Sequence, residues 1–160
     1  DLKASAEKEV VFDQKNCRFI PHAMVIRTDQ TILCKSDDSC SHNTHAFPQR
    51  NNPENFVLPT VDRKGIPIKM KLAEAAPIDV KCDIHGWMSA KWLIVDHPYA
   101  AVTDADGKFK IDKLPVGTHK FRVWHERAGL IERDWTVVVK AEDNAVPPVK
   151  LTAEKLKPKK

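Results

Sequence analysis

The stretch Cys82-Asp83-Ile84-His85-Gly86-Trp87-Met88 decides how this sequence is interpreted. It contains three side chains that can bind a metal ion, and it directly follows residues 78–81, in which apolar and charged residues alternate as in a strand. A thiolate, an imidazole and a thioether at Cys-x2-His-x2-Met spacing converge on one soft metal ion if the loop curls tightly. Cysteine and methionine together favour copper, whereas zinc gains little from a methionine. Taken singly, each has an ordinary interpretation: Cys82 as half of a disulfide, His85 as a surface turn residue and Met88 as a core filler.

A further histidine source lies upstream, in Ser41-His42-Asn43-Thr44-His45. Adding His42 to the three side chains above gives a His2Cys plane with a weak axial thioether, the donor set of a blue-copper electron-transfer site. Since His42 and Cys82 are 40 positions apart, the fold and not the local sequence has to bring them together. On an extended strand His45 points to the opposite face from His42. We therefore expect it to contact the ligand residues without binding the metal, or to lie on the surface.

Together these two motifs resemble those of the cupredoxins, the type 1 blue copper proteins of the amicyanin and plastocyanin kind. The resemblance covers about residues 9–96 and implies an eight-stranded Greek-key β-sandwich in a periplasmic or otherwise extracytoplasmic setting. It also implies one copper ion per chain, cycling between Cu(I) and Cu(II), with His42, Cys82, His85 and Met88 as its ligands.

The resemblance further implies a function, one-electron transfer between extracytoplasmic redox partners. In this interpretation Asn43 braces the ligand loops, His85 is the ligand nearest the surface, and Trp87 is an apolar docking element or a roof over the site. The partners are then redox proteins, such as a cytochrome or an oxidoreductase, and the lysines of the chain favour one that is acidic at the contact.

Three cysteines remain. Aligned with the cupredoxins, Cys17 and Cys40 lie at the metal end of the sandwich, so we predict a disulfide between them, in agreement with an oxidising compartment. Cys34 alternates with Ile32 and is predicted to be a buried thiol. The alternative is that all three cysteines are free.

Strand signals dominate the chain. Short apolar runs, several of them alternating with charged residues, predict strands at residues 10–12, 19–20, 23–26, 31–34, 78–82, 91–95, 108–111, 120–124 and 135–139. Such a series, separated by turn residues, is typical of an all-β sandwich or barrel with antiparallel strands. The single helix that we expect lies near residues 67–76, and residues 48–60 are expected to form an ordered surface loop.

The C-terminal third exceeds the cupredoxin pattern. Residues 101–117 contain Thr103-Asp104-Ala105-Asp106-Gly107 and Leu114-Pro115-Val116-Gly117, and resemble the carboxypeptidase-regulatory, transthyretin-like β-module. Asp104 and Asp106 lack the further ligands of a calcium-binding loop, so we interpret them as turn residues.

This pattern predicts the organisation of the chain. We expect a cupredoxin domain at residues 1–96, a β extension at 97–150 and a basic tail at 151–160. Because so short an extension buries little surface alone, we expect its antiparallel strands to pack on the first sandwich.

Composition excludes several classes of protein. The chain has 160 residues, of which 42% are hydrophobic and 30% charged, so it is neither disordered nor collagen-like. A net charge of +4 is too mild for a typical nucleic-acid binder, and no apolar run approaches the roughly 18 residues that span a membrane. The start at Asp1, with neither an initiator Met nor an apolar signal core, is interpreted as a mature or trimmed N-terminus after removal of a targeting segment.

We expect an electron carrier and not an enzyme. A copper reductase needs another metal cluster, and the histidines left over, His22, His97, His119 and His125, have no ligand spacing of their own. The alternative is a copper-containing or structural subunit of a larger redox complex. Copper storage or delivery suits a Met-rich carrier better than this mixed donor set. We also hypothesise that His97, His125 or Glu126 supports the end of the sandwich that holds the copper ion.

Overall fold

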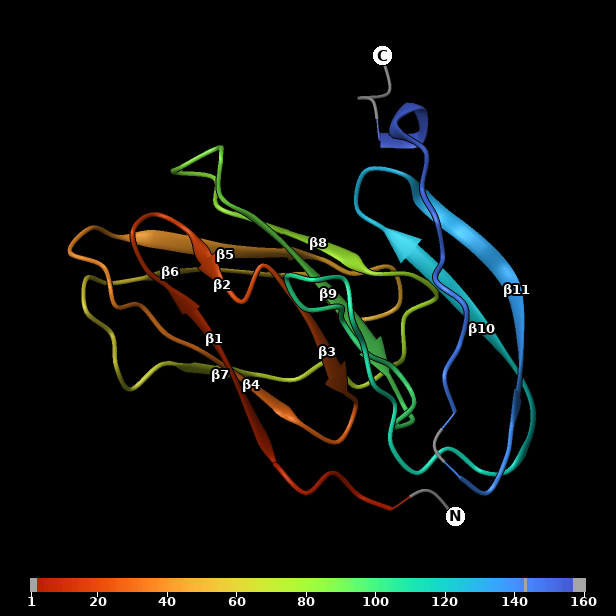
Figure 1. Cartoon of the computed structure of the whole chain (residues 1–160). Coiled ribbons are helices and arrows are strands. Elements are labelled where there is room, and N and C mark those ends of the chain that lie inside the picture. Colours follow the sequence, from red (N-terminus) through yellow and green to blue (C-terminus); the bar gives the residue numbers. More distant parts are fainter. Residues whose placement is uncertain (1–2, 143, 157–160) are drawn as a thin grey trace. The chain divides into compact units, whose positions relative to one another are not determined.

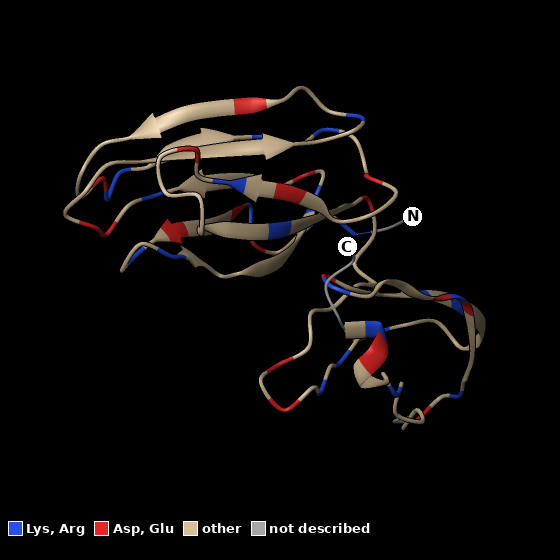
Figure 2. Ribbon diagram, turned by 90° about the horizontal axis from the view of Figure 1, so that it is seen from above, with Lys and Arg blue, Asp and Glu red and all other residues tan. Residues whose placement is uncertain are grey.

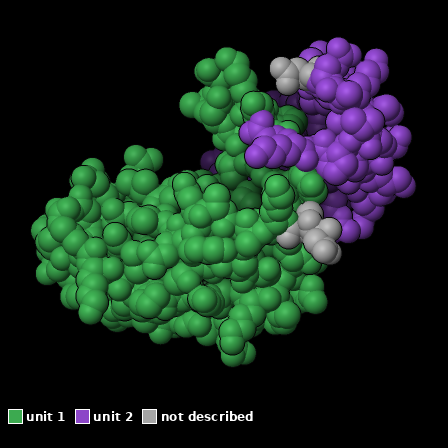
Figure 3. Space-filling view, turned by 90° about the horizontal axis from the view of Figure 1, so that it is seen from below, with its two compact units in different colours: residues 1–111 green, residues 112–160 purple. Residues whose placement is uncertain are grey.

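The chain forms two compact units. The computed structural model describes residues 3–142 and 144–156. The units comprise residues 1–111 and 112–160 and are coloured separately in Figure 3. The sequence-based division into residues 1–96, 97–150 and 151–160 stays a prediction.

The regular secondary structure described in the first unit consists of β-strands, which confirms the all-β fold class. Their bounds are β1 Glu9–Gln14, β2 Phe19–Ile20, β3 Ala23–Arg27, β4 Thr31–Cys34, β5 His42–Phe47, β6 Glu54–Leu58, β7 Ile66–Ile68, β8 Ile78–Lys81 and β9 Ser89–Val95. They form a four-stranded sheet in the order β2-β1-β4-β7 and a five-stranded sheet in the order β3-β9-β8-β5-β6 (Figure 1).

Two strand pairs are parallel, β1 with β4 and β3 with β9, where the alternating sequence pattern suggested antiparallel neighbours. Because β1 and β4 are parallel, the loops that follow them leave the sheet at the same end of the strands. Backbone bonds continue the pairing into these loops, from Lys35 N–H to Phe12 O (2.8 Å) and from Asp37 N–H to Gln14 O (2.8 Å). The loops after β1 and β4 are therefore held side by side.

Strand β5 lies between β6 and β8 and is antiparallel to both. His45 is paired with Lys81, the last residue of β8. Since antiparallel strands run in opposite directions, the start of β5 at His42 lies beside the loop that follows β8, residues 82–88. This topology brings together the two motifs that are far apart in the sequence.

The core of the first unit lies between its two sheets. Phe12 of β1 meets Trp92 of β9 edge-on, with ring centroids 4.9 Å apart, and stacks on Phe19 at 5.0 Å. Burial of such side chains contributes about 1.5–3 kcal/mol each. The fully buried Gln14 also donates to Thr44 Oγ1 across the sheets (3.1 Å). This packing confirms the predicted sandwich, and Cys34 is buried in it as predicted.

The described part of the second unit contains one long hairpin, β10 (Gly117–His125) with β11 (Gly129–Val139), and a short 3-10 helix, η1 (Ala153–Leu156). The expected strands at 120–124 and 135–139 are thus present. The resemblance of this region to the carboxypeptidase-regulatory module stays a prediction. Residues 157–160 of the predicted basic tail lie outside the described residues.

Three local expectations are wrong. Residues 48–60 contain strand β6, in which Phe56 and Leu58 turn inward at period two. Residues 67–76 form no helix, because Ile66 and Ile68 pair with β4 as strand β7. Residues 108–111 form no strand, since a turn takes the start of that segment: Asp104 N–H donates to Lys108 O (2.9 Å) and Lys108 N–H donates to Asp104 Oδ1 (2.8 Å).

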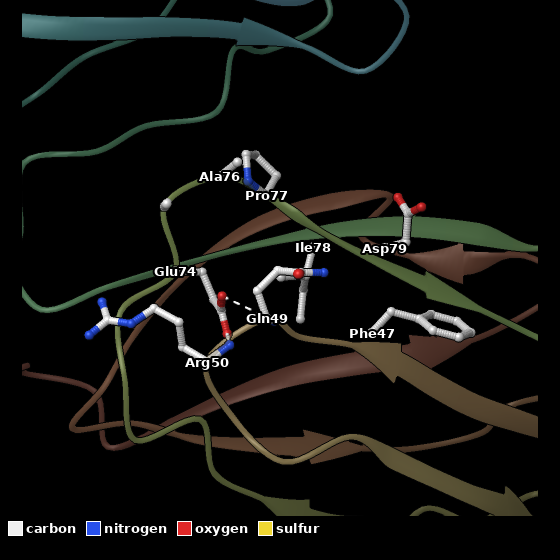
Figure 4. Close-up of a pocket in the computed structure, with 9 residues that line it drawn as sticks. Phe47, Gln49, Arg50, Glu74, Ala76, Pro77, Ile78 and Asp79 are labelled. Atoms are coloured by element: carbon white, nitrogen blue, oxygen red, sulfur yellow. Dashed lines mark hydrogen bonds between the residues drawn. The ribbon is translucent and has the colours of Figure 1, made fainter.

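One buried carboxylate organises the loop after β5. Glu74 Oε1 accepts hydrogen bonds from the backbone N–H groups of Arg50 (3.0 Å) and Asn51 (3.2 Å), and Oε2 accepts one from Gln49 N–H (3.2 Å). A pocket opens beside this carboxylate (Figure 4). It is lined by Phe47, the last residue of β5, and so lies at the end of β5 remote from His42.

Charged residues of both signs are interspersed along the strands and loops of the first unit (Figure 2). Among the described residues, none of the helical segments has the length and apolar character that a membrane span requires.

Candidate metal centre

Side chains from β5 and from the β8–β9 loop converge at one end of the larger sheet. The ligand atoms of His42, Cys82 and His85 all lie within 4.8 Å of one another. His42 Nδ1 and His85 Nδ1 face each other at 2.9 Å, and Cys82 Sγ lies 3.9 Å from His85 Nδ1. His42 and Cys82 are buried, whereas His85 is partly exposed.

These separations are close to those of a shared ion. Two imidazole nitrogens at about 2.0–2.1 Å from one metal lie about 3.3–3.4 Å apart at the tetrahedral angle, and a sulfur at about 2.3 Å lies about 3.6 Å from each. The cluster distances of 2.9 and 3.9 Å are within about 0.5 Å of that arrangement, so a small adjustment accommodates an ion. Two nitrogens and a thiolate are donors that a soft or borderline metal prefers. The residues present therefore fit a copper ion.

The loop from Cys82 to Met88 is closed by its own backbone. Cys82 N–H donates to Met88 O (3.2 Å) and Met88 N–H donates to His85 O (2.9 Å). His85 N–H donates to Cys82 Sγ (3.3 Å). Met88 is only 2% exposed, so the fourth candidate ligand belongs to the buried side of the loop.

Asp38 contacts the His42 ring on the side opposite His85. Its Oδ2 lies 2.8 Å from His42 Nε2. If Nε2 carries the proton and donates it to Asp38, the lone pair is on Nδ1, the nitrogen that faces His85. Burial opposes ionisation of Asp38, but hydrogen bonds from Cys17 N–H and His42 outweigh it and hold the pKa of the carboxyl below its ordinary value.

Asn43 ties the two ligand segments together. Its Oδ1 accepts from Asp83 N–H (2.6 Å), and its Nδ2 donates to Asn55 Oδ1 (2.9 Å) and to Asp83 Oδ2 (2.7 Å). Asn43 is 4% exposed, so its own side of these bonds is shielded from water. The bond from Asn43 holds the pKa of Asp83 below its ordinary value, although burial opposes ionisation.

His45 does not join the cluster. Its Nδ1 lies 3.0 Å from Asp83 Oδ2, and its ring stacks on Phe47 with centroids 4.0 Å apart. Trp87 does flank the centre, because its ring centroid is 5.1 Å from that of His85. Trp87 is 70% exposed and donates through Nε1 to Cys17 O (3.2 Å).

The cysteines of the predicted disulfide lie together but are not bonded. Cys17 and Cys40 are free thiols whose Sγ atoms are 3.7 Å apart. A disulfide requires sulfurs about 2.05 Å apart, so the predicted bridge is absent from this structure. Cys34 is a free thiol whose burial raises its pKa to about 12.

Sequence reasoning missed two acidic contributors, Asp38 and Asp83. Asp38 stands in the polar run Ser36-Asp37-Asp38-Ser39, which predicts only a turn. The available signal was its position four residues before His42. His97 and His125, for which a supporting role is hypothesised, make local bonds: His97 Nδ1 accepts from Tyr99 N–H (3.2 Å), and His125 Nδ1 accepts from Arg127 N–H (3.1 Å).

Comparisons with known proteins give structural likenesses alone. No known protein family and no curated protein matches this sequence. Amicyanin from Paracoccus versutus (Thiobacillus versutus) is similar in structure, at 18% identity and a TM-score of 0.45, covering 57% of this chain and 85% of that protein. An amicyanin variant in the Cu(I) form has 13% identity and a TM-score of 0.45, with coverages of 55% and 83%. A reduced amicyanin variant has 16% identity and a TM-score of 0.43, with coverages of 57% and 86%.

Proposed function

We propose that this protein binds one copper ion through His42, Cys82, His85 and Met88 and carries single electrons, without catalysing a reaction on a substrate. One observation supports this most strongly: two imidazole Nδ1 atoms 2.9 Å apart face each other beside a buried cysteine sulfur. Met88, which closes the same loop, distinguishes the set from an ordinary zinc site, because zinc gains little from a thioether.

Copper, when bound here, supplies a Cu(II)/Cu(I) couple. The chain supplies donors held in place before the ion arrives. His42 is fixed by Asp38 (2.8 Å), and the ligand loop is fixed by its own hydrogen bonds and by Asn43. Because these ligand residues are held in place, their positions change little between the two oxidation states, which suits rapid electron exchange.

The partly exposed His85 offers a short route to a partner. It lies beside Trp87, whose ring is 70% exposed and provides an apolar contact surface. Exposed aromatic residues at the centre of a polar surface are typical of protein contacts. We infer a redox protein partner, a cytochrome or an oxidoreductase that is acidic at the contact, in a periplasmic or other extracytoplasmic compartment.

Copper titration followed by redox cycling tests the proposal. We expect the reduced protein to bind one copper per chain, to turn blue on oxidation and to bleach with one electron per copper in coulometry. His85→Ala removes one imidazole and is expected to abolish the blue colour. His97→Ala is the matched control, since His97 bonds locally to Tyr99, and it is expected to leave the colour unchanged. A wild-type protein that holds zinc in preference to copper, or a copper form without reversible one-electron chemistry, contradicts the proposal.

A further inference from the structure

A second cluster of metal-ligand side chains lies behind His42. The ligand atoms of Cys17, Asp38, Cys40 and His42 lie within 4.8 Å of one another. The cluster contains two thiols, a carboxylate and an imidazole, a donor set that zinc accepts in tetrahedral sites. It uses His42 Nε2, whereas the first cluster uses His42 Nδ1. The two clusters therefore lie on opposite sides of one ring.

The separations in this second cluster agree with a tetrahedral ion. Two sulfurs about 2.3 Å from one zinc lie about 3.8 Å apart at the tetrahedral angle, and a sulfur and an imidazole nitrogen lie about 3.6 Å apart. Cys17 Sγ and Cys40 Sγ are separated by 3.7 Å, and Cys40 Sγ and His42 Nε2 by 3.5 Å. Asp38 Oδ2 is 2.8 Å from the same nitrogen, close enough to share an ion after a small adjustment.

The backbone holds these groups in position. Asn16 and Cys17 both have left-handed conformations, with φ of 54° and 52°, which are uncommon for residues with a side chain. Their successive N–H groups donate to the two oxygens of Asp38, at 2.5 Å from Asn16 and 2.8 Å from Cys17. The parallel pairing of β1 and β4 places the two loops side by side. The loop with Cys17 is thus fixed to the loop with Asp38 and Cys40.

We propose that Cys17, Asp38, Cys40 and His42 form a second metal site, for zinc or another thiolate-binding divalent ion. On binding, the two thiols release their protons to solvent, the His42 ring keeps its one proton on Nδ1, and the ion replaces the hydrogen bond between His42 Nε2 and Asp38. The shared ring links this site to the first one. A disulfide between Cys17 and Cys40 is the competing state of the same pair and leaves no thiolate for a metal.

Cobalt(II) is a suitable probe, because thiolate-bound cobalt has a charge-transfer absorption that imidazole and carboxylate ligands do not give. The tested protein is full-length Cys82→Ser, fully reduced under anaerobic conditions, so the thiolate of the first site is absent. We expect one cobalt per chain with thiolate charge-transfer absorption, displaced by one equivalent of zinc. Adding Cys17→Ser and Cys40→Ser is expected to abolish that absorption, and adding Asp38→Asn to weaken cobalt binding at least tenfold.

Cys34→Ala in the Cys82→Ser background is the matched control, because it removes a thiol outside the cluster and is expected to leave the absorption intact. Circular dichroism verifies that each variant is folded. The proposal is overturned if folded, reduced Cys82→Ser gives no thiolate absorption, if the absorption survives loss of both Cys17 and Cys40, or if mass spectrometry shows a bridge that resists reduction. Since Cys82 is missing from every tested chain, these results are independent of the copper proposal.

Discussion

Replacing Asn43 with alanine tests whether this side chain joins the two ligand segments. Asn43 Oδ1 accepts from the backbone N–H of Asp83 at 2.6 Å, and Nδ2 donates to Asn55 at 2.9 Å. A typical hydrogen bond contributes about 0.5–1.5 kcal/mol net. Counting these two bonds, and omitting the one to the exposed Asp83 carboxylate, Asn43→Ala is expected to lower the free energy of unfolding by about 1–3 kcal/mol.

The assay is thermal unfolding of the metal-free protein followed by circular dichroism. For a unit of this size the loss corresponds to a fall in Tm on the order of 5–15 °C. The same variant is expected to bind copper more weakly, because the loop that carries Cys82 and His85 is no longer fixed to β5. Asn55→Ala is the control: it removes one of the two counted bonds and is expected to cost about half as much, about 0.5–1.5 kcal/mol. A fall in Tm no larger for Asn43→Ala than for Asn55→Ala, with unchanged copper affinity, refutes the reasoning.

Three further predictions concern the core, the Glu74 carboxylate and the proposed ligand Met88. Phe12→Ala removes a fully buried ring and is expected to cost about 3–5 kcal/mol in urea unfolding; a loss below about 1 kcal/mol contradicts the described core. Burial opposes ionisation of Glu74, but bonds from Arg50 and Asn51 hold its pKa below the ordinary 4.5. Its contribution is therefore complete above that value and lost as the pH falls through the lower folded pKa, so Glu74→Gln is expected to lose less Tm on acidification than the wild type, and an identical acid profile contradicts this. Met88→Leu keeps the volume but would remove a donor to Cu(II), so voltammetry of the copper-loaded protein is expected to show a raised reduction potential, and an unchanged potential contradicts Met88 as a ligand.

The sequence predicts most strands of the sandwich because their alternation follows from burial of one face. It does not predict β5, because His42, Asn43 and Thr44 are three consecutive buried polar residues and leave no apolar alternation. Likewise, the segment Ile66–Ile68 is extended because it pairs with β4, a tertiary contact that local propensity does not contain. The parallel pairing of β1 with β4 also depends on the whole fold.

The candidate site is predictable only in part, for the same reason. Cys82, His85 and Met88 lie within one short loop, so their spacing alone suggests a shared ion. Asp38 is different, because its role depends on two loops that meet through strand pairing, where its oxygens accept from Asn16 and Cys17. The close approach of the Cys17 and Cys40 thiols likewise arises from that pairing and from the left-handed turn at Cys17.

The visible absorption spectrum of the copper-loaded, oxidised protein tests the central claim most directly. A copper ion bound to the Cys82 thiolate gives an intense blue charge-transfer absorption. We predict that the wild-type protein and Cys34→Ala show it and that folded Cys82→Ser has lost it. A colourless wild-type copper form, or a blue colour that persists in Cys82→Ser, contradicts a copper site built on Cys82.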